Sequence, residues 1–247
     1  RLEGMKVATV RMNPRRSRMK RFDASQAETM PGVEKIVDLG DGIAVIATNT
    51  WLAMQAADAV DIEWEKAAYA DTDIQFAQLK ATFADKPNAT PRDEGDVEQE
   101  FDGTLVQAEY RVPALAHATM EPMNATALFT GDALTLWSGN QAPGSAQSAC
   151  AEAVGLVPEQ VEVITPYLGG GFGRRAETDF SVLAAKVAKA MPGVPVKTTW
   201  SREEDMRHDK YRPPALARFK GVVKDGHAVM LDGQLASQTV LPLPGPN

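Results

Sequence analysis

The chain has 247 residues, a length that allows one large domain or two ordinary domains. Hydrophobic residues make up 44% of it, so a sizeable core can form and wholesale disorder is disfavoured. The formal net charge of -7 argues against a nucleic-acid-binding protein, which usually carries a basic stripe. A basic cluster near the start is better explained as a strand edge facing solvent, a partner or a cofactor. It comprises Arg11, Arg15, Arg16, Arg18, Lys20 and Arg21.

The single cysteine, Cys150, excludes a disulfide within the chain and a thiolate metal site, and it leaves the compartment undecided. No run of 18 apolar residues occurs, so no transmembrane segment is predicted. The first residues do not resemble a signal peptide and start in the middle of a pattern. The last residues stop just after a strand-like stretch. Both ends lead us to expect a fragment of a longer protein.

Residues 5–65 predict a compact α/β unit with the order β-α-β-β-α-β. Alternating or continuously apolar runs rich in β-branched residues indicate the strands. Helical spacing of apolar residues after Thr50, which we expect to cap the helix, indicates the second helix. The expected strands are 5–12, 33–40, 42–49 and 61–65, and the expected helices are 22–30 and 50–60.

Residues 66–100 are acidic and polar, and they predict one short helix near 73–84 followed by an exposed linker. A second unit then begins with a strand and a hairpin at a "TGD" turn. Ser201 and Glu204 form an expected capping box at the start of "SREEDM". Strands are expected at 105–113, 125–140 (the hairpin), 160–167, 194–200, 215–223 and 228–237, and helices at 142–155 and 176–191.

The run "YLGGGFGRRAETDF" at 167–180 lies between an expected strand and an expected helix, which is the layout of a backbone anion site. Arg174 and Arg175 add positive charge. The dinucleotide fingerprint fails, because the place of its third glycine holds Arg174. A P-loop is disfavoured because the glycine run is not followed by a lysine and then Ser or Thr. The alternative is a tight turn packed against a helix. Phe172 favours a bound group, since a large ring among glycines can form a wall beside it.

Other candidate residues have simpler explanations. His117 and Glu121 stand at a spacing that suits two metal ligands on one helix face, but Pro122 follows, and a structural histidine is the better interpretation. Cys150 lies among small residues, which favours buried packing over a nucleophile. Gln141 follows a strand, so its amide can point at a ligand or simply face water.

Several stretches together resemble the molybdenum-binding subunit of the xanthine dehydrogenase and aldehyde oxidase family, in its isoquinoline 1-oxidoreductase beta-subunit branch. They are "LAHATMEPMNATA", "WSGNQAPGSAQSACAEAVGLVPEQVEVITPYLGGGFGRR", "TTWSREEDM" and "YRPPALARFKGVV". The resemblance implies an α/β (α+β) fold: a hammerhead domain at 1–66, a linker with a short helix at 67–100, and the first part of a molybdopterin-binding domain at 101–247.

The resemblance also implies cofactors, partners and site residues. A molybdenum held by molybdopterin, as the cytosine dinucleotide in bacterial members, would oxidatively hydroxylate an aldehyde or N-heterocycle with oxygen from water. Electrons would leave through two [2Fe-2S] clusters on a small subunit, with a cytochrome c as a further acceptor. Arg212 matches a substrate-orienting arginine, and no side chain of this chain is expected to bind the metal directly. The residues matched to the cofactor are Gln141, Gly170, Gly171, Phe172, Gly173 and Arg174.

Two features depart from the family pattern. Ala176 stands where purine-oxidising relatives carry a glutamate, and Glu177 comes one place late, which puts purine specificity in doubt. The family's glutamate base and most cofactor contacts lie in the C-terminal half of the subunit, so we expect the 247 residues alone to be inactive. The alternative is a non-catalytic assembly module with an empty glycine loop. Relatives in this branch are often exported, which favours the periplasm over the cytoplasm.

Overall fold

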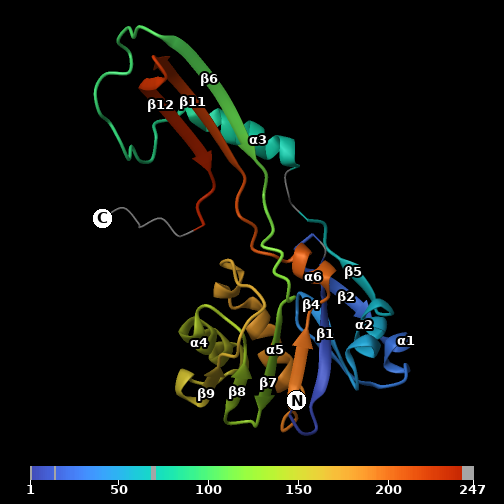
Figure 1. The fold of residues 1–247 in the computed structure, drawn as a ribbon. Helices are drawn as coiled ribbons and strands as arrows, with labels where there is room; N and C mark the ends of the chain where they lie inside the picture. The colour runs from blue at the N-terminus through green and yellow to red at the C-terminus, as the bar shows by residue number, and fades with distance from the viewer. Residues whose placement is uncertain (1, 14, 68–70, 241–247) are drawn as a thin grey trace. The chain divides into compact units, whose positions relative to one another are not determined.

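The computed structural model describes residues 2–13, 15–67 and 71–240, and the chain forms two compact units (Figure 1). Unit 1 consists of Arg1–Ala68 together with His117–Lys210, and unit 2 consists of Tyr69–Ala116 together with Tyr211–Asn247. Each unit is therefore built from two separate stretches of the chain. This division cuts across the expected boundaries at residues 66 and 100, because strands from both expected domains share one sheet.

A seven-stranded mixed sheet forms the centre of unit 1, with the strand order β3-β4-β1-β10-β7-β8-β9. Its strands are β1 (Lys6–Met12), β3 (Val33–Asp38), β4 (Gly42–Ala47), β7 (Asn124–Phe129), β8 (Leu134–Trp137), β9 (Val161–Ile164) and β10 (Val196–Thr199). β1 and β10 run parallel, with Lys6 opposite Val196, and this pairing joins the start of the chain to its second half. β2 (Met19–Asp23) and β5 (Asp61–Trp64) form a separate antiparallel pair.

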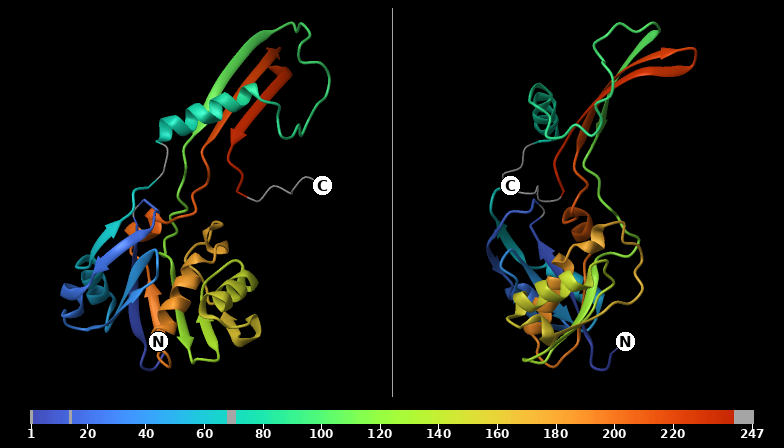
Figure 2. Two further views of the ribbon diagram at one scale, coloured as in Figure 1. Left: turned by 180° about the vertical axis from the view of Figure 1, so that it is seen from behind. Right: turned by 90° about the vertical axis from the view of Figure 1, so that its left-hand side faces the viewer.

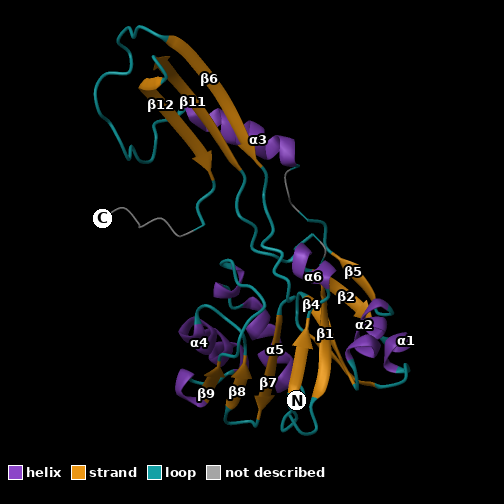
Figure 3. Cartoon of the chain, in the orientation of Figure 1, coloured by secondary structure: helices purple, strands orange, loops and turns teal. Residues whose placement is uncertain are grey.

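The helices of unit 1 lie beside the sheet, as the purple elements in Figure 3 show. They are α1 (Ser25–Glu28), α2 (Thr50–Asp58), α4 (Pro143–Val154), α5 (Asp179–Lys189) and α6 (Arg202–Arg207), with 3-10 turns η2 (Pro158–Gln160) and η3 (Arg174–Ala176). α4 begins at a proline, which suits the first turn, and ends at Gly155 in the left-handed conformation, as its sequence predicts. The cap of α2 differs from the expectation: Asn49, not Thr50, accepts a hydrogen bond from the Leu52 amide.

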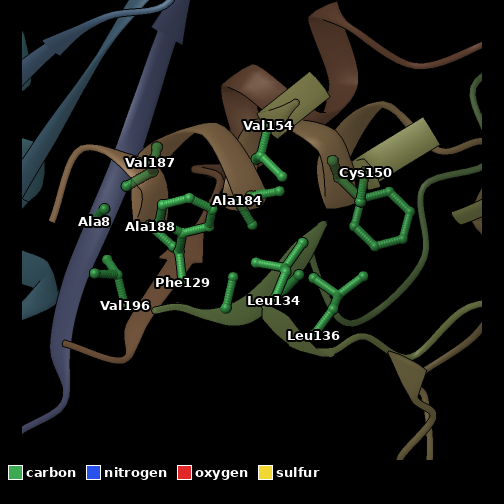
Figure 4. Close-up of a cluster of buried hydrophobic side chains, with 14 of the residues drawn as sticks. Ala8, Phe129, Leu134, Leu136, Cys150, Val154, Ala184, Val187, Ala188 and Val196 are labelled. Carbon is green, nitrogen blue, oxygen red and sulfur yellow. The ribbon is translucent and has the colours of Figure 1, made fainter. Parts of the chain in front are cut away.

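Two apolar clusters hold unit 1 together, and β4 contributes to both. All six β4 residues are buried: Ile43 and Val45 pack with α2, while Ala44 and Ile46 belong to the larger cluster. This explains why the strand reads as a continuous apolar run. The larger cluster is drawn in Figure 4, where Phe129, Leu134 and Leu136 of β7 and β8 meet residues of α4 and α5.

Cys150 is fully buried in this larger cluster, and burial raises the pKa of its thiol to about 12. A thiol with such a pKa stays protonated at neutral pH and is a poor nucleophile. The packing role predicted for this cysteine is therefore confirmed.

Unit 2 is a three-stranded antiparallel sheet with one helix beside it (Figure 2). Its elements are β6 (Thr104–Val112), β11 (Ala215–Lys224), β12 (His227–Ser237), α3 (Thr72–Ala81) and the 3-10 turn η1 (Thr82–Ala84). The expected helix near 73–84 and the expected hairpin at "KDGH" are both confirmed. Asp225 and Gly226 have positive φ angles of 50° and 77°, which suits a two-residue hairpin turn.

One strand was not expected. β2 covers the end of the basic cluster and the first two residues of the helix expected at 22–30, so the order of the first 65 residues is β-β-α-β-β-α-β. Its sequence, MKRFD, lacks the apolar alternation of a core strand, and it is paired only with β5. No helix of the described residues has the length and apolarity needed to cross a membrane.

Candidate functional site

The glycine run forms a tight loop between β9 and α5, and we call residues Gly169–Gly173 the glycine loop. Three of its residues have positive φ angles: Gly170 at 102°, Phe172 at 53° and Gly173 at 97°. Glycine adopts such angles without the steric cost that a Cβ atom brings, so two of the glycines are explained by the backbone path. The expectation that a helix starts directly after the loop is wrong. η3 intervenes and α5 begins only at Asp179, so its N-terminal dipole is not at the glycines.

Gln141 reaches the glycine loop from the segment between β8 and α4. Its side-chain Oε1 accepts a hydrogen bond of 3.1 Å from the Gly173 amide, and its backbone amide donates a hydrogen bond of 2.9 Å to the Arg175 carbonyl. A Cβ atom on Gly171 would lie 2.6 Å from this Oε1. Glycine at position 171 is therefore what allows Gln141 to approach. The structure thus brings together Gln141 and the predicted loop residues.

Glu121 holds the other end of the glycine loop, a role that the sequence analysis missed. Its Oε2 accepts a hydrogen bond of 2.8 Å from the Gly169 amide and lies 3.0 Å from Nη2 of Arg175. A Cβ atom on Gly169 would lie 2.5 Å from the Cβ atom of Glu121. The interpretation as a packed turn therefore holds for Gly169. The glutamate lies in the quoted segment "LAHATMEPMNATA", but only the fold shows that this segment meets the loop.

Three hydrogen-bond donors at the glycine loop have no acceptor among the described residues. They are the backbone amides of Gly170 and Gly171 and Nε2 of Gln141. Gly171 is buried, and a buried amide without an acceptor costs free energy, so such groups are rare unless something else binds them. Converging donors favour an electron-rich oxygen, such as that of a phosphate or a metal-oxo group. The described residues contain no group of three or more His, Cys, Asp or Glu arranged to hold a metal ion.

Phe172 is 65% exposed, and its ring folds back over the glycine loop. A Cβ atom on Gly170 would lie 3.1 Å from Cε2 of this ring. The ring therefore lies beside the open amides, and its predicted role as an apolar wall for a bound group stays a prediction.

Arg174 supports the glycine loop from inside the protein instead of pointing its charge outward. Its guanidinium is buried and makes two hydrogen bonds to Asp179, at 2.8 and 2.9 Å. Its Nε lies 3.1 Å from Oδ1 of Asp209, and the group stacks 5.7 Å from the ring centre of Trp200. Because these partners already satisfy the charge, we assign Arg174 a supporting role and not a direct contact with a ligand.

His117 joins this network through Asp209. Its Nδ1 lies 2.8 Å from Oδ1 of Asp209, and its backbone amide donates to Oδ2 of the same carboxylate. His117 precedes β7 and is not in a helix, so the helical spacing with Glu121 does not occur. The histidine holds Asp209, which in turn holds Arg174, in agreement with a structural role.

Arg175 is the second buried support. It donates hydrogen bonds of 3.0 Å to the carbonyl of Gly170 and to the carbonyl of Gly139, and it also contacts Glu121. The side chain thereby ties the glycine loop to the segment that carries Gln141. Both arginines of the motif are thus used to fix the position of the loop.

A cleft of about 390 Å³ lies elsewhere in unit 1, lined in part by Met12, Leu183, Trp200 and His208. Next to it, the buried Glu204 accepts a hydrogen bond of 3.2 Å from the Met12 amide. Burial raises the pKa of Glu204 to about 7 and lowers the pKa of His208 to about 4. At neutral pH a neutral imidazole therefore faces this carboxyl group, and the 3.4 Å contact is not an ion pair.

Arg212 belongs to unit 2, where its backbone forms a single β-bridge with Leu115. The glycine loop belongs to unit 1. The predicted substrate-orienting role of Arg212 stays a prediction.

The fold and the site together define a class: a mixed α/β protein that presents open backbone amides and a glutamine amide from a rigid glycine loop. The family model described as a molybdopterin cofactor-binding domain matches residues 82–240, which is more than half of the chain. The chain therefore belongs to the molybdopterin cofactor-binding domain family. The resemblance to molybdenum-binding subunits of the xanthine dehydrogenase and aldehyde oxidase family is confirmed. The matched region begins inside the segment expected to be a linker.

Among curated proteins, the chain is 29% identical over 234 residues to the membrane-bound aldehyde dehydrogenase [pyrroloquinoline-quinone] of Gluconacetobacter polyoxogenes. It is 26% identical over 237 residues to the isoquinoline 1-oxidoreductase subunit beta of Brevundimonas diminuta. These matches cover 89% and 90% of this chain, but only 30% of each relative. The chain thus spans less than a third of the length of these relatives.

The aldehyde oxidoreductase of Desulfovibrio gigas has a similar solved structure, with a TM-score of 0.71 and 21% identity. The match covers 95% of this chain and 31% of that one. At this identity the likeness establishes the fold, and the expected α/β (α+β) fold of these subunits is confirmed.

Proposed function

We propose that these residues are part of the catalytic subunit of a molybdenum hydroxylase that oxidises an aldehyde or an N-heterocycle. The observation that carries the proposal is the set of open donors at Gly170, Gly171 and Gln141, in a chain that belongs to the molybdopterin-binding family. The relatives described above carry the names of an aldehyde dehydrogenase and an isoquinoline oxidoreductase, which fits this substrate class.

In this proposal the glycine loop binds and orients the cofactor. The amides of Gly170 and Gly171 and Nε2 of Gln141 would donate hydrogen bonds to its anionic oxygen atoms. Donors held around a preformed concavity need no reorganisation when such a group binds. Phe172 excludes water beside them, and Gly173 keeps Gln141 in place through its 3.1 Å hydrogen bond. When bound, molybdopterin with its molybdenum supplies the two-electron chemistry by which oxygen from water enters an electron-poor carbon.

Most of the remaining parts of the reaction would be supplied from outside these 247 residues. We propose that the longer subunit supplies the glutamate base and most cofactor contacts, and that the cofactor is the cytosine dinucleotide form. A small subunit with two [2Fe-2S] clusters would take the electrons and pass them to an acceptor such as cytochrome c. Arg212 would orient the substrate. Residues 1–66 would form the hammerhead domain and residues 101–247 the first part of the cofactor domain.

The test is to express the longer subunit with its iron–sulfur partner in a host that makes the cofactor. We expect molybdenum close to one atom per subunit, and oxidation of aldehydes or N-heterocycles that places ¹⁸O from labelled water in the product. The 247 residues alone should show neither. Protein without molybdenum and without activity would favour a non-catalytic module. Bound pyrroloquinoline quinone, the cofactor in the name of one relative, would instead contradict the proposed cofactor.

A further inference from the structure

The sheet of unit 2 has two faces of opposite chemistry, and the register of its strands defines them. On one face, Arg218 of β11 lies opposite Glu109 of β6 and Gln234 of β12. The next row on this face is Lys220 with Gln107 and Asp232. Charged and amide side chains therefore occupy the middle of this face.

Helix α3 and η1 pack on this charged face. Arg111 lies 4.2 Å from the ring centre of Phe76, and Arg218 lies 4.4 Å from that of Phe83. Lys80 of the helix contacts Glu109 at 3.6 Å. The right-hand view of Figure 2 shows the helix on one side of the sheet. The helix that belongs to unit 2 thus covers the polar side of its sheet.

The opposite face, which we call the apolar face, carries three rows of residues without a polar side chain, apart from the hydroxyl group of Tyr110. Ala217 lies between Tyr110 and Leu235, and Gly221 lies between Val106 and Leu231. In the row between them, Phe219 is paired with Ala108 and Gly233. A Cβ atom on Gly233 would lie 2.9 Å from the Phe219 ring, so this ring lies flat over β12.

The described residues leave the apolar face uncovered. Leu235 is 73% exposed, Leu231 is 66% exposed and Tyr110 is 58% exposed. Exposed apolar side chains are common singly, but a contiguous face of a sheet is normally buried against another layer. An uncovered layer of this kind favours a protein contact over a small ligand, because it is flat and extended along three strands.

We infer that the apolar face is covered by another part of the same longer subunit, outside these 247 residues, which presents a complementary apolar surface. The inference rests on the proposed function, which makes this chain part of a longer subunit. The relatives described above are about three times as long as their match to this chain, so they contain ample chain for a covering layer. Permanently buried contacts are apolar in this way and resemble a domain core, whereas transient contacts are about as polar as the rest of a protein surface.

Cysteine labelling tests this inference without measuring molybdenum or activity. Leu235→Cys and Leu231→Cys place thiols on the apolar face, and Gln234→Cys places one on the charged face of the same strand. The native Cys150 is buried and should not react. Each variant is labelled with a maleimide in the 247-residue chain and in the longer subunit, and the β12 peptide is quantified by mass spectrometry.

We expect labelling of Leu235→Cys and Leu231→Cys to be at least about tenfold slower in the longer subunit, with Gln234→Cys changed less than about twofold. Equal labelling of the two leucine positions in both proteins would overturn the inference. Protection already present in the 247-residue chain would also overturn it. Light scattering at two concentrations would then show whether a second copy covers the face. Protection that requires the iron–sulfur subunit would assign the face to that partner instead.

Discussion

Each glycine of the glycine loop is required for a different physical reason. These reasons distinguish the glycines that support the loop from the one that shapes the candidate binding site. Gly169 makes room for Glu121, and Gly170 and Gly173 supply positive φ angles. Gly171 is different because the atom that a Cβ would meet is the end of the Gln141 side chain, 2.6 Å away. The end of a flexible side chain can move, so a substitution there should change the site more than the fold.

We therefore predict that Gly171→Ala displaces the Gln141 amide and lowers the molybdenum content of the longer subunit severalfold, while the free energy of unfolding changes by less than about 1 kcal/mol. Metal analysis and denaturant unfolding of the same preparation check this. Gly144→Ala is the matched control, because nothing lies within 4 Å of the added Cβ atom at the start of α4. Full molybdenum content in Gly171→Ala would show that the Gln141 position is unimportant.

Glu204 gives a prediction about pH. Burial raises its pKa to about 7 from a usual value of 4.5, so the folded protein holds this proton more tightly than the unfolded chain. The resulting stabilisation is complete below pH 4.5 and is lost as pH rises to about 7. For a shift of this size the loss is roughly 3 kcal/mol. Glu204→Gln, which cannot titrate, should lack this loss.

The measurement is the difference in free energy of unfolding between the native chain and Glu204→Gln, followed from pH 4.5 to pH 8. The native chain should lose stability relative to the variant as pH rises. Taking the difference removes the opposite effect of His208, whose lowered pKa destabilises the fold as pH falls. Glu203→Gln, a change at an exposed neighbour in α6, leaves Glu204 in place and should lose stability with rising pH as the native chain does. A difference that stays constant with pH would refute the account of Glu204.

At the scale of elements, α2 offers a test of where a helix begins. Asn49 has an extended backbone and its side chain accepts from the Leu52 amide at 2.9 Å, while Thr50 is already inside the helix. Asn49→Ala should cost about 1 kcal/mol of stability, because a helix amide loses its acceptor. Thr50→Ala should cost less than about 0.5 kcal/mol. Shifts in the denaturant midpoint check both values, and the reverse order would restore Thr50 as the cap.

Elements with strong local signals could be predicted from the sequence. Pro143 and Gly155 mark the two ends of α4, and the spacing of Phe180, Ala184 and Val187 marks α5. β2 could not be predicted, because its polar residues form a strand only through pairing with β5. The supports of the glycine loop were hidden for a similar reason. Glu121 meets Gly169 across 48 positions, and Asp209 meets His117 across 92.

At the scale of the whole molecule, the chain forms two compact units, and each unit is built from two separate stretches of the chain. The parallel pairing of β1 with β10 joins residues 190 positions apart, and no local pattern indicates such a contact. The family resemblance nevertheless selected Gln141 and the glycine loop correctly as neighbours. The sequence also led us to expect that Arg174 and Arg175 add positive charge to an anion site. Their buried partners show instead that the two side chains hold the loop in place and do not face outward.

The most direct test of the central claim is to locate molybdenum in the loaded, longer subunit by anomalous scattering at its absorption edge. The account predicts that an oxygen or pterin atom of the cofactor accepts hydrogen bonds from the Gly171 amide and from Nε2 of Gln141. Phe172 should lie beside it. A metal centre remote from these donors, or amides of Gly170 and Gly171 bonded to main-chain carbonyls in the loaded protein, would contradict the account.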